Sequence, residues 1–183
     1  MHPKVLAAMS GGVDSSVAAL ALVERGLEVV GVTLRLYDSC SGSARACCGL
    51  EDAADAASAA RLLGIEHRIL EHQEAFRRLV IQPFAAEYAA GRTPNPCVLC
   101  NERVKFGTLW EYARSHGFDA LATGHYARVI GEGGRFALMR GLDREKDQSY
   151  FLFSLDPAIL PRVLFPLGGW TKARVRERAR AAG

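Results

Sequence analysis

Residues 10–16, Ser-Gly-Gly-Val-Asp-Ser-Ser, lie where an apolar run over residues 5–9 gives way to a helical pattern over residues 17–25. Glycine reaches backbone angles closed to other residues, so paired glycines let main-chain amides face an anion. The helix that follows adds the positive end of its dipole, and the serines add hydroxyl donors. The stretch predicts a phosphate-binding loop between a strand and a helix. A serine-rich turn with a helix cap is the alternative.

The loop differs from the two common phosphate-binding motifs. It has no lysine after its second glycine, as the Walker loop requires, and it lacks the Gly-x-Gly-x-x-Gly spacing of dinucleotide-binding folds. It carries Asp14 instead. Because a carboxylate repels bound phosphate unless a cation lies between them, Asp14 predicts a Mg²⁺ ion held on the phosphates.

The chain around this loop alternates between strand and helix patterns. The expected strands are residues 5–9, 28–36, 65–70 and 118–123, and the expected helices are residues 17–25, 51–63, 73–90 and 101–116. This order predicts an α/β fold, a Rossmann-like parallel sheet with helices on both faces. A small hairpin within residues 129–139 and a C-terminal helix after Thr171 are appended to it. Ligands of such sheets bind beyond the carboxyl ends of the strands, where the loop lies.

Composition and charge narrow the class of protein. The chain has 183 residues, of which 49% are hydrophobic, enough for one sizeable domain. No apolar run approaches the roughly 20 residues that span a bilayer, and no signal-peptide pattern precedes the first strand. We therefore expect a cytoplasmic protein with no membrane partner. The net charge of +3 is concentrated in residues 170–183, where a basic helix either lies along RNA phosphates or presents a solvated face.

The cysteines fall into two groups. Cys40, Cys47 and Cys48 lie in a polar loop with no histidine nearby, which favours ordinary loop cysteines over a metal site. Cys97 and Cys100 are spaced Cys-x-x-Cys just before the helix expected from residue 101. The chain therefore lacks the pattern of a disulfide framework, and in a reducing compartment the second group indicates reactivity or metal binding.

The segment around the second group favours a reactive thiolate. The prolines within residues 93–96 exclude helix and make a stiff spacer. The dipole of the following helix and the nearby cations Arg92, Arg103 and Lys105 favour a thiolate there. Such a thiolate suits sulfur transfer. A disulfide, half of a structural zinc site and inert packing are the alternatives.

Five stretches together resemble one family. They are residues 10–16 (SGGVDSS), 47–52 (CCGLED), 93–101 (TPNPCVLCN), 122–128 (ATGHYAR) and 146–150 (KDQSY). The first resembles the pyrophosphate loop of the N-type ATP pyrophosphatases, and all five together are similar to the bacterial tRNA-specific 2-thiouridylases. This resemblance implies ATP-dependent 2-thiolation of the wobble uridine (position 34) of tRNA. The C2 oxygen is adenylated with release of pyrophosphate, and sulfur then displaces AMP.

The resemblance also implies roles for individual residues. The residues assigned to ATP are Ala8, Met9, Ser10, Gly11, Gly12, Val13, Asp14, Ser15, Ser16, Leu34 and Gly124. The residues assigned to tRNA are Asn95, Pro96, Cys97, Lys146, Asp147 and Gln148. The catalytic residues are Cys100, the sulfur-transferring nucleophile, with Cys97 and Asp14. Without the resemblance, Leu34 would be plain core and residues 146–148 a solvated turn. His125 is interpreted as structural rather than as a catalytic or ribose contact.

Cys97 bears on the source of sulfur. In the family, members that use a persulfide have an aspartate at this position, and members that bind an iron–sulfur cluster have a cysteine. Cys97 and Cys100 are therefore candidate ligands of a [4Fe–4S] cluster, with a third ligand outside this chain because no cysteine follows Cys100. The donor is expected to be a cysteine desulfurase or a relay protein.

The resemblance also implies a domain division. The chain is about half as long as a typical family member, so we expect its N-terminal portion. Residues 1–165 would form the ATP pyrophosphatase catalytic domain. Residues 166–183 would begin the central or linker region, with the later domains absent from this chain.

Three other functions remain open. Another ATP pyrophosphatase, acting on a small amide or acid as an amidotransferase or ligase does, shares the loop but has no need of the cysteine pair. A tRNA enzyme of the two-thiocytidine type has Cys-x-x-Cys in a different sequence setting. A non-enzymatic RNA-binding module would account for the basic residues 170–183 and leave residues 10–16 without a role.

Overall fold

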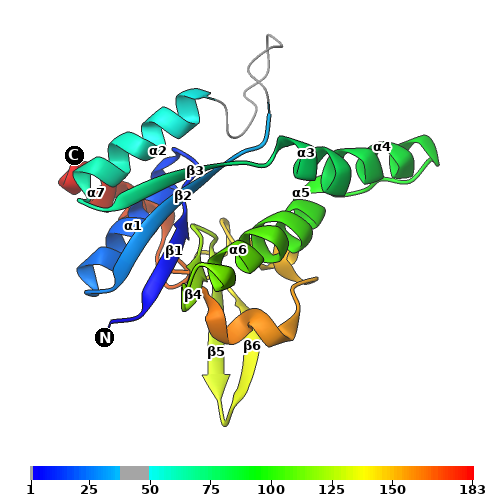
Figure 1. Cartoon of the computed structure of the whole chain (residues 1–183). Helices are drawn as coiled ribbons and strands as arrows, with labels where there is room; N and C mark the ends of the chain where they lie inside the picture. The colour runs from blue at the N-terminus through cyan, green and yellow to red at the C-terminus, as the bar shows by residue number, and fades with distance from the viewer. Residues whose placement is uncertain (1, 38–49) are drawn as a thin grey trace.

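The computed structural model describes residues 2–37 and 50–183, and its centre is a five-stranded parallel sheet (Figure 1). The strands are β1 (Lys4–Ala8), β2 (Glu28–Arg35), β3 (Glu66–Glu71), β4 (Ala120–Ala122) and β7 (Val163–Leu164). Their order across the sheet is β3-β2-β1-β4-β7. Because β2 and β4 flank β1, the strand order reverses at β1. The predicted parallel sheet is confirmed, whereas Cys40, Cys47 and Cys48 lie outside the described residues.

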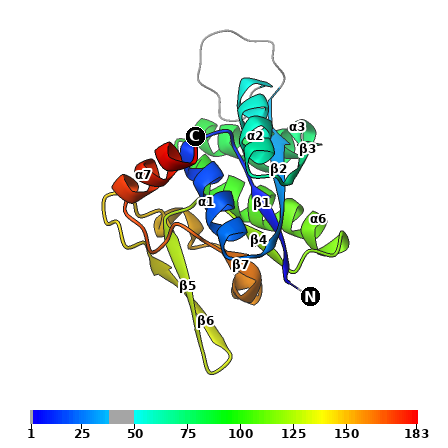
Figure 2. The ribbon, with the colours of Figure 1, turned by 90° about the vertical axis from the view of Figure 1, so that its left-hand side faces the viewer.

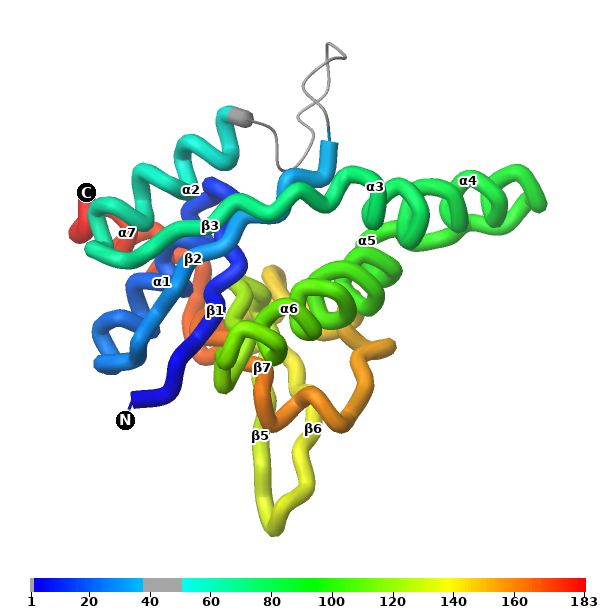
Figure 3. Tube along the Cα trace, in the orientation of Figure 1, coloured from blue at the N-terminus to red at the C-terminus, as the bar shows by residue number. Residues whose placement is uncertain are grey.

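Helices connect these strands. They are α1 (Val13–Glu24), α2 (Leu50–Leu62), α3 (Gln73–Phe76), η1 (Arg77–Ile81), α4 (Gln82–Ala89), α5 (Pro96–Leu99), η2 (Cys100–Thr108), α6 (Leu109–Ser115), η3 (Ser149–Leu152), η4 (Pro157–Arg162) and α7 (Lys172–Ala182). The rod formed by α3, η1 and α4 extends away from the sheet (Figure 3). The segments η1 and η2 are π-helical, with one residue more per hydrogen-bonded turn, which the apolar periodicity did not predict.

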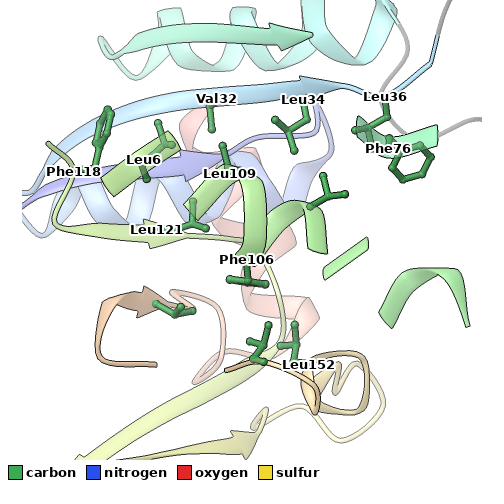
Figure 4. Packing of buried hydrophobic residues seen from close by; sticks show 14 of the residues in the cluster. Leu6, Val32, Leu34, Leu36, Phe76, Phe106, Leu109, Phe118, Leu121 and Leu152 are labelled. Atoms are coloured by element: carbon green, nitrogen blue, oxygen red, sulfur yellow. The ribbon is translucent and has the colours of Figure 1, made fainter. Parts of the chain in front are cut away.

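Helices cover both faces of the sheet, as predicted (Figure 2). Alternate residues of a strand face opposite sides, and β1 shows this alternation. Leu6 belongs to a core that includes Leu109 of α6 and Phe106 of η2 (Figure 4). Val5 and its neighbours on the opposite face pack in a second core with Leu22 of α1. All five of these side chains are nearly or fully buried, so the sheet holds β1 and the residues after it in a fixed position.

A two-stranded hairpin and a C-terminal helix are appended to this sheet. The strands β5 (Ala127–Glu132) and β6 (Arg135–Arg140) form the predicted antiparallel hairpin. The helix α7 begins after Thr171, whose side chain accepts a hydrogen bond from the Arg174 amide, and it packs on α1 through the fully buried Val175. The predicted domain boundary after residue 165 stays a prediction. Within the described part of the chain, no helix is long and apolar enough to span a membrane.

Two differences from the expected elements matter for the site. The helix α1 begins at Val13 rather than at residue 17, so Asp14 lies in its first turn. The prolines of residues 93–96 were expected to exclude helix, but Pro96 occupies the first helical position of α5. A proline is tolerated there because the missing amide would have no partner in the helix. Cys100 therefore lies inside a continuous helical segment rather than before it.

Candidate active site

A cavity of about 240 Å³ opens beside the carboxyl ends of β1 and β4, at the reversal of strand order. This is the position at which open parallel sheets bind their ligands. Its lining residues are Ala8, Met9, Ser10, Asp14, Ser15, Val32, Leu34, Leu36, Lys105, Thr123, Gly124, His125 and Gln148. The structure thus brings together seven of the residues predicted to bind ATP. The remaining four, Gly11, Gly12, Val13 and Ser16, belong to the same loop and helix start without lining this cavity.

The loop is held by its own hydrogen bonds. The Ser10 amide donates to the Ser15 hydroxyl at 3.1 Å, and that hydroxyl donates to the Gly12 carbonyl at 2.8 Å. Gly11 has a φ of +76°, and a Cβ there would collide with the main-chain carbonyl of Asp52 on α2. Glycine is therefore required at Gly11 both by its backbone angle and by the close approach of α2.

Gly124 makes a second close approach. A Cβ at this position would lie 3.1 Å from the Ser15 amide nitrogen and 3.1 Å from the Asp14 carbonyl carbon. The chain after β4 therefore runs against the first turn of α1. The structure shows that glycine here makes room for the backbone that carries the loop. The expected approach of a nucleotide to Gly124, which also lines the cavity, stays a prediction.

Asp14 has two partners that the sequence did not indicate. The Lys172 ammonium lies 2.6 Å from each carboxylate oxygen, and the Tyr126 hydroxyl donates to the same carboxylate at 2.9 Å. Burial and the neighbouring Asp14 charge raise the pKa of Tyr126, so the hydroxyl stays protonated as a donor. Lys172 belongs to the predicted basic helix, but its ammonium points to the loop. Tyr126 lies next to His125 in a stretch singled out for the family, yet nothing in the sequence linked it to Asp14.

The carboxylate of Asp14 fits the predicted Mg²⁺ as one ligand of an ion that a bound phosphate also holds. Residues 2–37 and 50–183 hold no group of three or more side chains able to ligate a metal ion. Mg²⁺ is commonly bound by one or two carboxylates together with substrate phosphates and water. Asp14 therefore suits an ion shared with a phosphate ligand, and such an ion would compete with Lys172 for the carboxylate.

His125 forms part of the cavity wall. Its Nδ1 lies 2.7 Å from the Thr123 hydroxyl, and its ring packs against Phe106 and Phe165 with centroids 6.1 and 6.0 Å away. Burial, followed by the positive charge of Lys105, lowers the pKa of His125 to about 3. The imidazole is therefore neutral at physiological pH.

The residues predicted to contact tRNA near residue 147 have different settings. Gln148 lines the cavity, and its side-chain oxygen accepts from the Tyr126 amide at 3.0 Å. Asp147 accepts from the amides of Gly141 and Ser149 at 2.9 and 3.2 Å, which holds the loop after β6. Lys146 is exposed. Of these three residues, Lys146 is thus the one whose side chain is exposed on the surface, whereas Asp147 and Gln148 bond to the main chain of the protein.

The cysteine pair lies at the start of the helical segment that lines the cavity. Asn95 caps α5, because its side-chain oxygen accepts from the Cys97 amide at 3.0 Å. Cys97 is exposed, and Cys100, three residues on, is half-buried against the core. Both are thiols rather than halves of a disulfide. Residues three apart on a helix share a face, so the two sulfur atoms can act together.

Two thiols do not complete an iron–sulfur site. A [4Fe–4S] cluster normally takes four cysteine thiolates, and the described residues supply only Cys97 and Cys100. The described residues therefore do not by themselves support a reaction step through a cluster.

The sequence did not indicate several residues of the cavity and its surroundings. They are Val32, Leu36, Lys105, Thr123, Tyr126 and Lys172. Lys105 was noted for its charge near the cysteines but not for the cavity. A signal for Thr123 was its place at the end of a predicted strand. The others lie at positions that only the packing of distant elements decides.

The sheet order and the cavity at its reversal define a class, the Rossmann-like α/β domains with a ligand site beyond the carboxyl ends of their strands. The model of the tRNA methyl transferase HUP domain matches residues 3–183, and the chain belongs to this family. A solved structure of a predicted tRNA methyltransferase subunit from Methanocaldococcus jannaschii shares the fold, with a TM-score of 0.54 and 18% identity. That likeness covers 97% of this chain and 74% of the other.

Curated relatives are more similar in sequence. The tRNA-specific 2-thiouridylase MnmA of Chloroflexus aurantiacus is 53% identical over 182 residues, which cover 98% of this chain and 51% of the relative. MnmA of Geobacter metallireducens is 51% identical over 187 residues, which cover 98% of this chain and 51% of the relative. The chain thus spans about half the length of the curated relatives it matches.

Proposed function

We propose that this chain supplies the nucleotide site and the transfer cysteine of a tRNA 2-thiouridylase. The observation that carries the proposal is that one continuous helical segment carries Cys100 and lines the loop cavity through Lys105. An adenylation site and a sulfur nucleophile would thus be parts of one rigid unit. The similarity to curated 2-thiouridylases supports uridine in tRNA as the substrate. Such an enzyme would work in the cytoplasm with ATP and a sulfur-donor protein.

The first step is adenylation. The apolar part of the cavity, which includes Val32 and Leu34, suits an adenine ring, and the polar part holds Ser10 and Ser15 at the N-terminus of α1. Amides and hydroxyls there would bind the phosphates, and a Mg²⁺ ion on Asp14 would neutralise their charge. The C2 oxygen of the uridine attacks the α-phosphorus, and the bond to pyrophosphate breaks. The adenylated oxygen is then a good leaving group.

The second step is sulfur transfer. A sulfur atom delivered to Cys100 as a persulfide attacks C2, and the bond between C2 and the adenylated oxygen breaks to release AMP. The Cys97 thiolate, three residues away on the helical segment, would then attack the Cys100 sulfur. A disulfide between the two cysteines forms as 2-thiouridine leaves, and a cellular thiol would reduce it. The cluster alternative stays a prediction.

Two variants of the full-length protein test the two steps separately. Cys100→Ser is expected to keep tRNA-dependent exchange of labelled pyrophosphate into ATP while forming no 2-thiouridine. Asp14→Asn is expected to lose the exchange as well. Thiolated tRNA from Cys100→Ser would contradict the role of Cys100. Exchange that needs a small acid or amide instead of tRNA would favour the other ATP pyrophosphatases.

A further inference from the structure

Lys105 is a half-buried cation on the wall of the loop cavity. It lines the cavity together with Ser10, Asp14 and Gln148. Its charge contributes to the lowered pKa of His125, another lining residue. Among the ion pairs of residues 2–37 and 50–183, none includes Lys105.

The carboxylate in the same cavity does not neutralise Lys105. Asp14 is paired with Lys172, whose ammonium contacts both of its oxygens at 2.6 Å. Partial burial of an ammonium group without a counter-charge is unfavourable, so such a group is retained where a ligand supplies the negative charge. Lys105 and the loop donors together therefore fit an anionic ligand in this cavity.

The π-helical geometry of η2 relates Lys105 to Cys100. In a regular α-helix, residues five apart point about 140° away from each other. A π-helix joins residues i and i+5, so these residues lie on nearly the same side. Gly107 permits the wide turn, because a Cβ there would lie 3.0 Å from the Glu102 carbonyl oxygen, five residues earlier. The same geometry turns Lys105 to the side of the helix on which Cys100 lies.

We propose that Lys105 is a catalytic residue that binds the phosphate of the adenylated uridine and stabilises AMP as it leaves. The inference rests on the proposed function. When sulfur forms its bond to C2, the bond from C2 to oxygen breaks, and its electron pair stays on the phosphate oxygen of AMP. The ammonium of Lys105 keeps its proton and offsets this added negative charge. Fixed charges of this kind commonly contribute about 10²- to 10³-fold to a rate.

Nucleotide binding to this chain tests the contact without any thiolation. The variant Lys105→Met removes the charge and keeps most of the stem, and its affinities for AMP and adenosine are compared by calorimetry. We expect AMP binding to weaken about tenfold or more, as for a lost hydrogen bond to a charged group, with adenosine binding unchanged. Arg103→Met is the matched control, because Arg103 is an exposed cation of the same segment that pairs with Glu102 outside the cavity. An unchanged ratio of AMP to adenosine affinity in Lys105→Met would overturn the proposal.

Kinetics of the full-length protein test the catalytic role. In Lys105→Met, we expect kcat for thiolation to fall about 10²-fold, with KM for tRNA nearly unchanged and partial recovery in Lys105→Arg. Thiolation within threefold of the wild-type rate would refute the catalytic role. If the wild-type protein binds AMP through Lys105 but never thiolates tRNA, the phosphate contact stands, while the catalytic role fails together with the proposed function.

Discussion

Asp14 at the start of α1 and Lys172 at the start of α7 are 158 residues apart in sequence and form an ion pair at 2.6 Å. The side chains are 36% and 23% exposed, so the pair lies at the edge of the cavity rather than in the core. Val175, one helical turn after Lys172, is fully buried against α1 and fixes the position of α7. The loop carboxylate is thus held by a helix from the far end of the chain.

Removal of this lysine should change the requirement for Mg²⁺. In Lys172→Met the carboxylate of Asp14 loses a competing cation, so half-saturation of ATP binding should need less Mg²⁺. Partly exposed ion pairs contribute about 0.2–1 kcal/mol, which corresponds to a shift of up to about fivefold. Calorimetric ATP titrations at several Mg²⁺ concentrations measure it. Arg178→Met, which removes an ion pair with Glu24 elsewhere on α7, is the control. An unchanged requirement in Lys172→Met would show that the two cations do not compete.

A methyl group at Gly124 should separate β4 from the loop. Its Cβ would lie 3.1 Å from main-chain atoms of Asp14 and Ser15, which cannot move independently of α1. We expect Gly124→Ala to lower the free energy of unfolding by about 1–3 kcal/mol and to weaken nucleotide binding. Urea denaturation measures the first effect. Gly169→Ala is the control, because a Cβ there meets no atom within 4 Å. Equal stability of the two variants would contradict the close approach.

The neutral imidazole of His125 should make stability depend on pH. Its pKa lies near 3 in the folded protein and near 6.5 when unfolded, because burial and then Lys105 lower it. Between these values the unfolded chain binds more protons. The contribution of His125 to stability is therefore complete above about pH 6.5 and is lost as the pH falls, by up to about 1.4 kcal/mol per pH unit.

Two histidine variants isolate this dependence. Unfolding in urea at pH 7.5, 6 and 5 should show a flatter loss of stability for His125→Gln than for the wild type. The exposed His116 provides the control His116→Gln, which should follow the wild type. A wild-type slope retained in His125→Gln would assign the pH dependence to other groups.

Cys97 should decide whether the full-length protein binds iron. Two thiolates close together supply part of a cluster site, so we expect iron and sulfide to bind after anaerobic reconstitution of the full-length protein. Cys97→Asp should abolish that binding because it removes a ligating thiolate. Cys97→Ser should in addition prevent a disulfide with Cys100 in air. Analysis of iron, acid-labile sulfide and visible absorbance measures the outcome. Thiolation by a protein that stays iron-free would leave Cys97 as a redox partner only.

Local patterns in the sequence were sufficient for the sheet and the loop. The alternation of strand and helix, the glycines of residues 10–16 and the cap at Thr171 act over a few residues, so their structural effect can be inferred from neighbouring residues alone. The start of α1, observed at Val13 and predicted at residue 17, also depends on neighbouring residues. The strand β7 was not predicted, because its two residues are too few for a periodic pattern.

The tertiary structure decided which distant side chains meet at the loop. The pair of Asp14 with Lys172 depends on how α7 packs on α1, and the entry of Lys105 into the cavity depends on the π-helical turn of η2. Sequence alone determined that a glycine-rich loop follows the first strand and that a thiol pair lies near the start of a later helix. It did not determine which cations face the loop, because a charged side chain carries no local signal of its partner, and the packing of the helices on the sheet selects that partner.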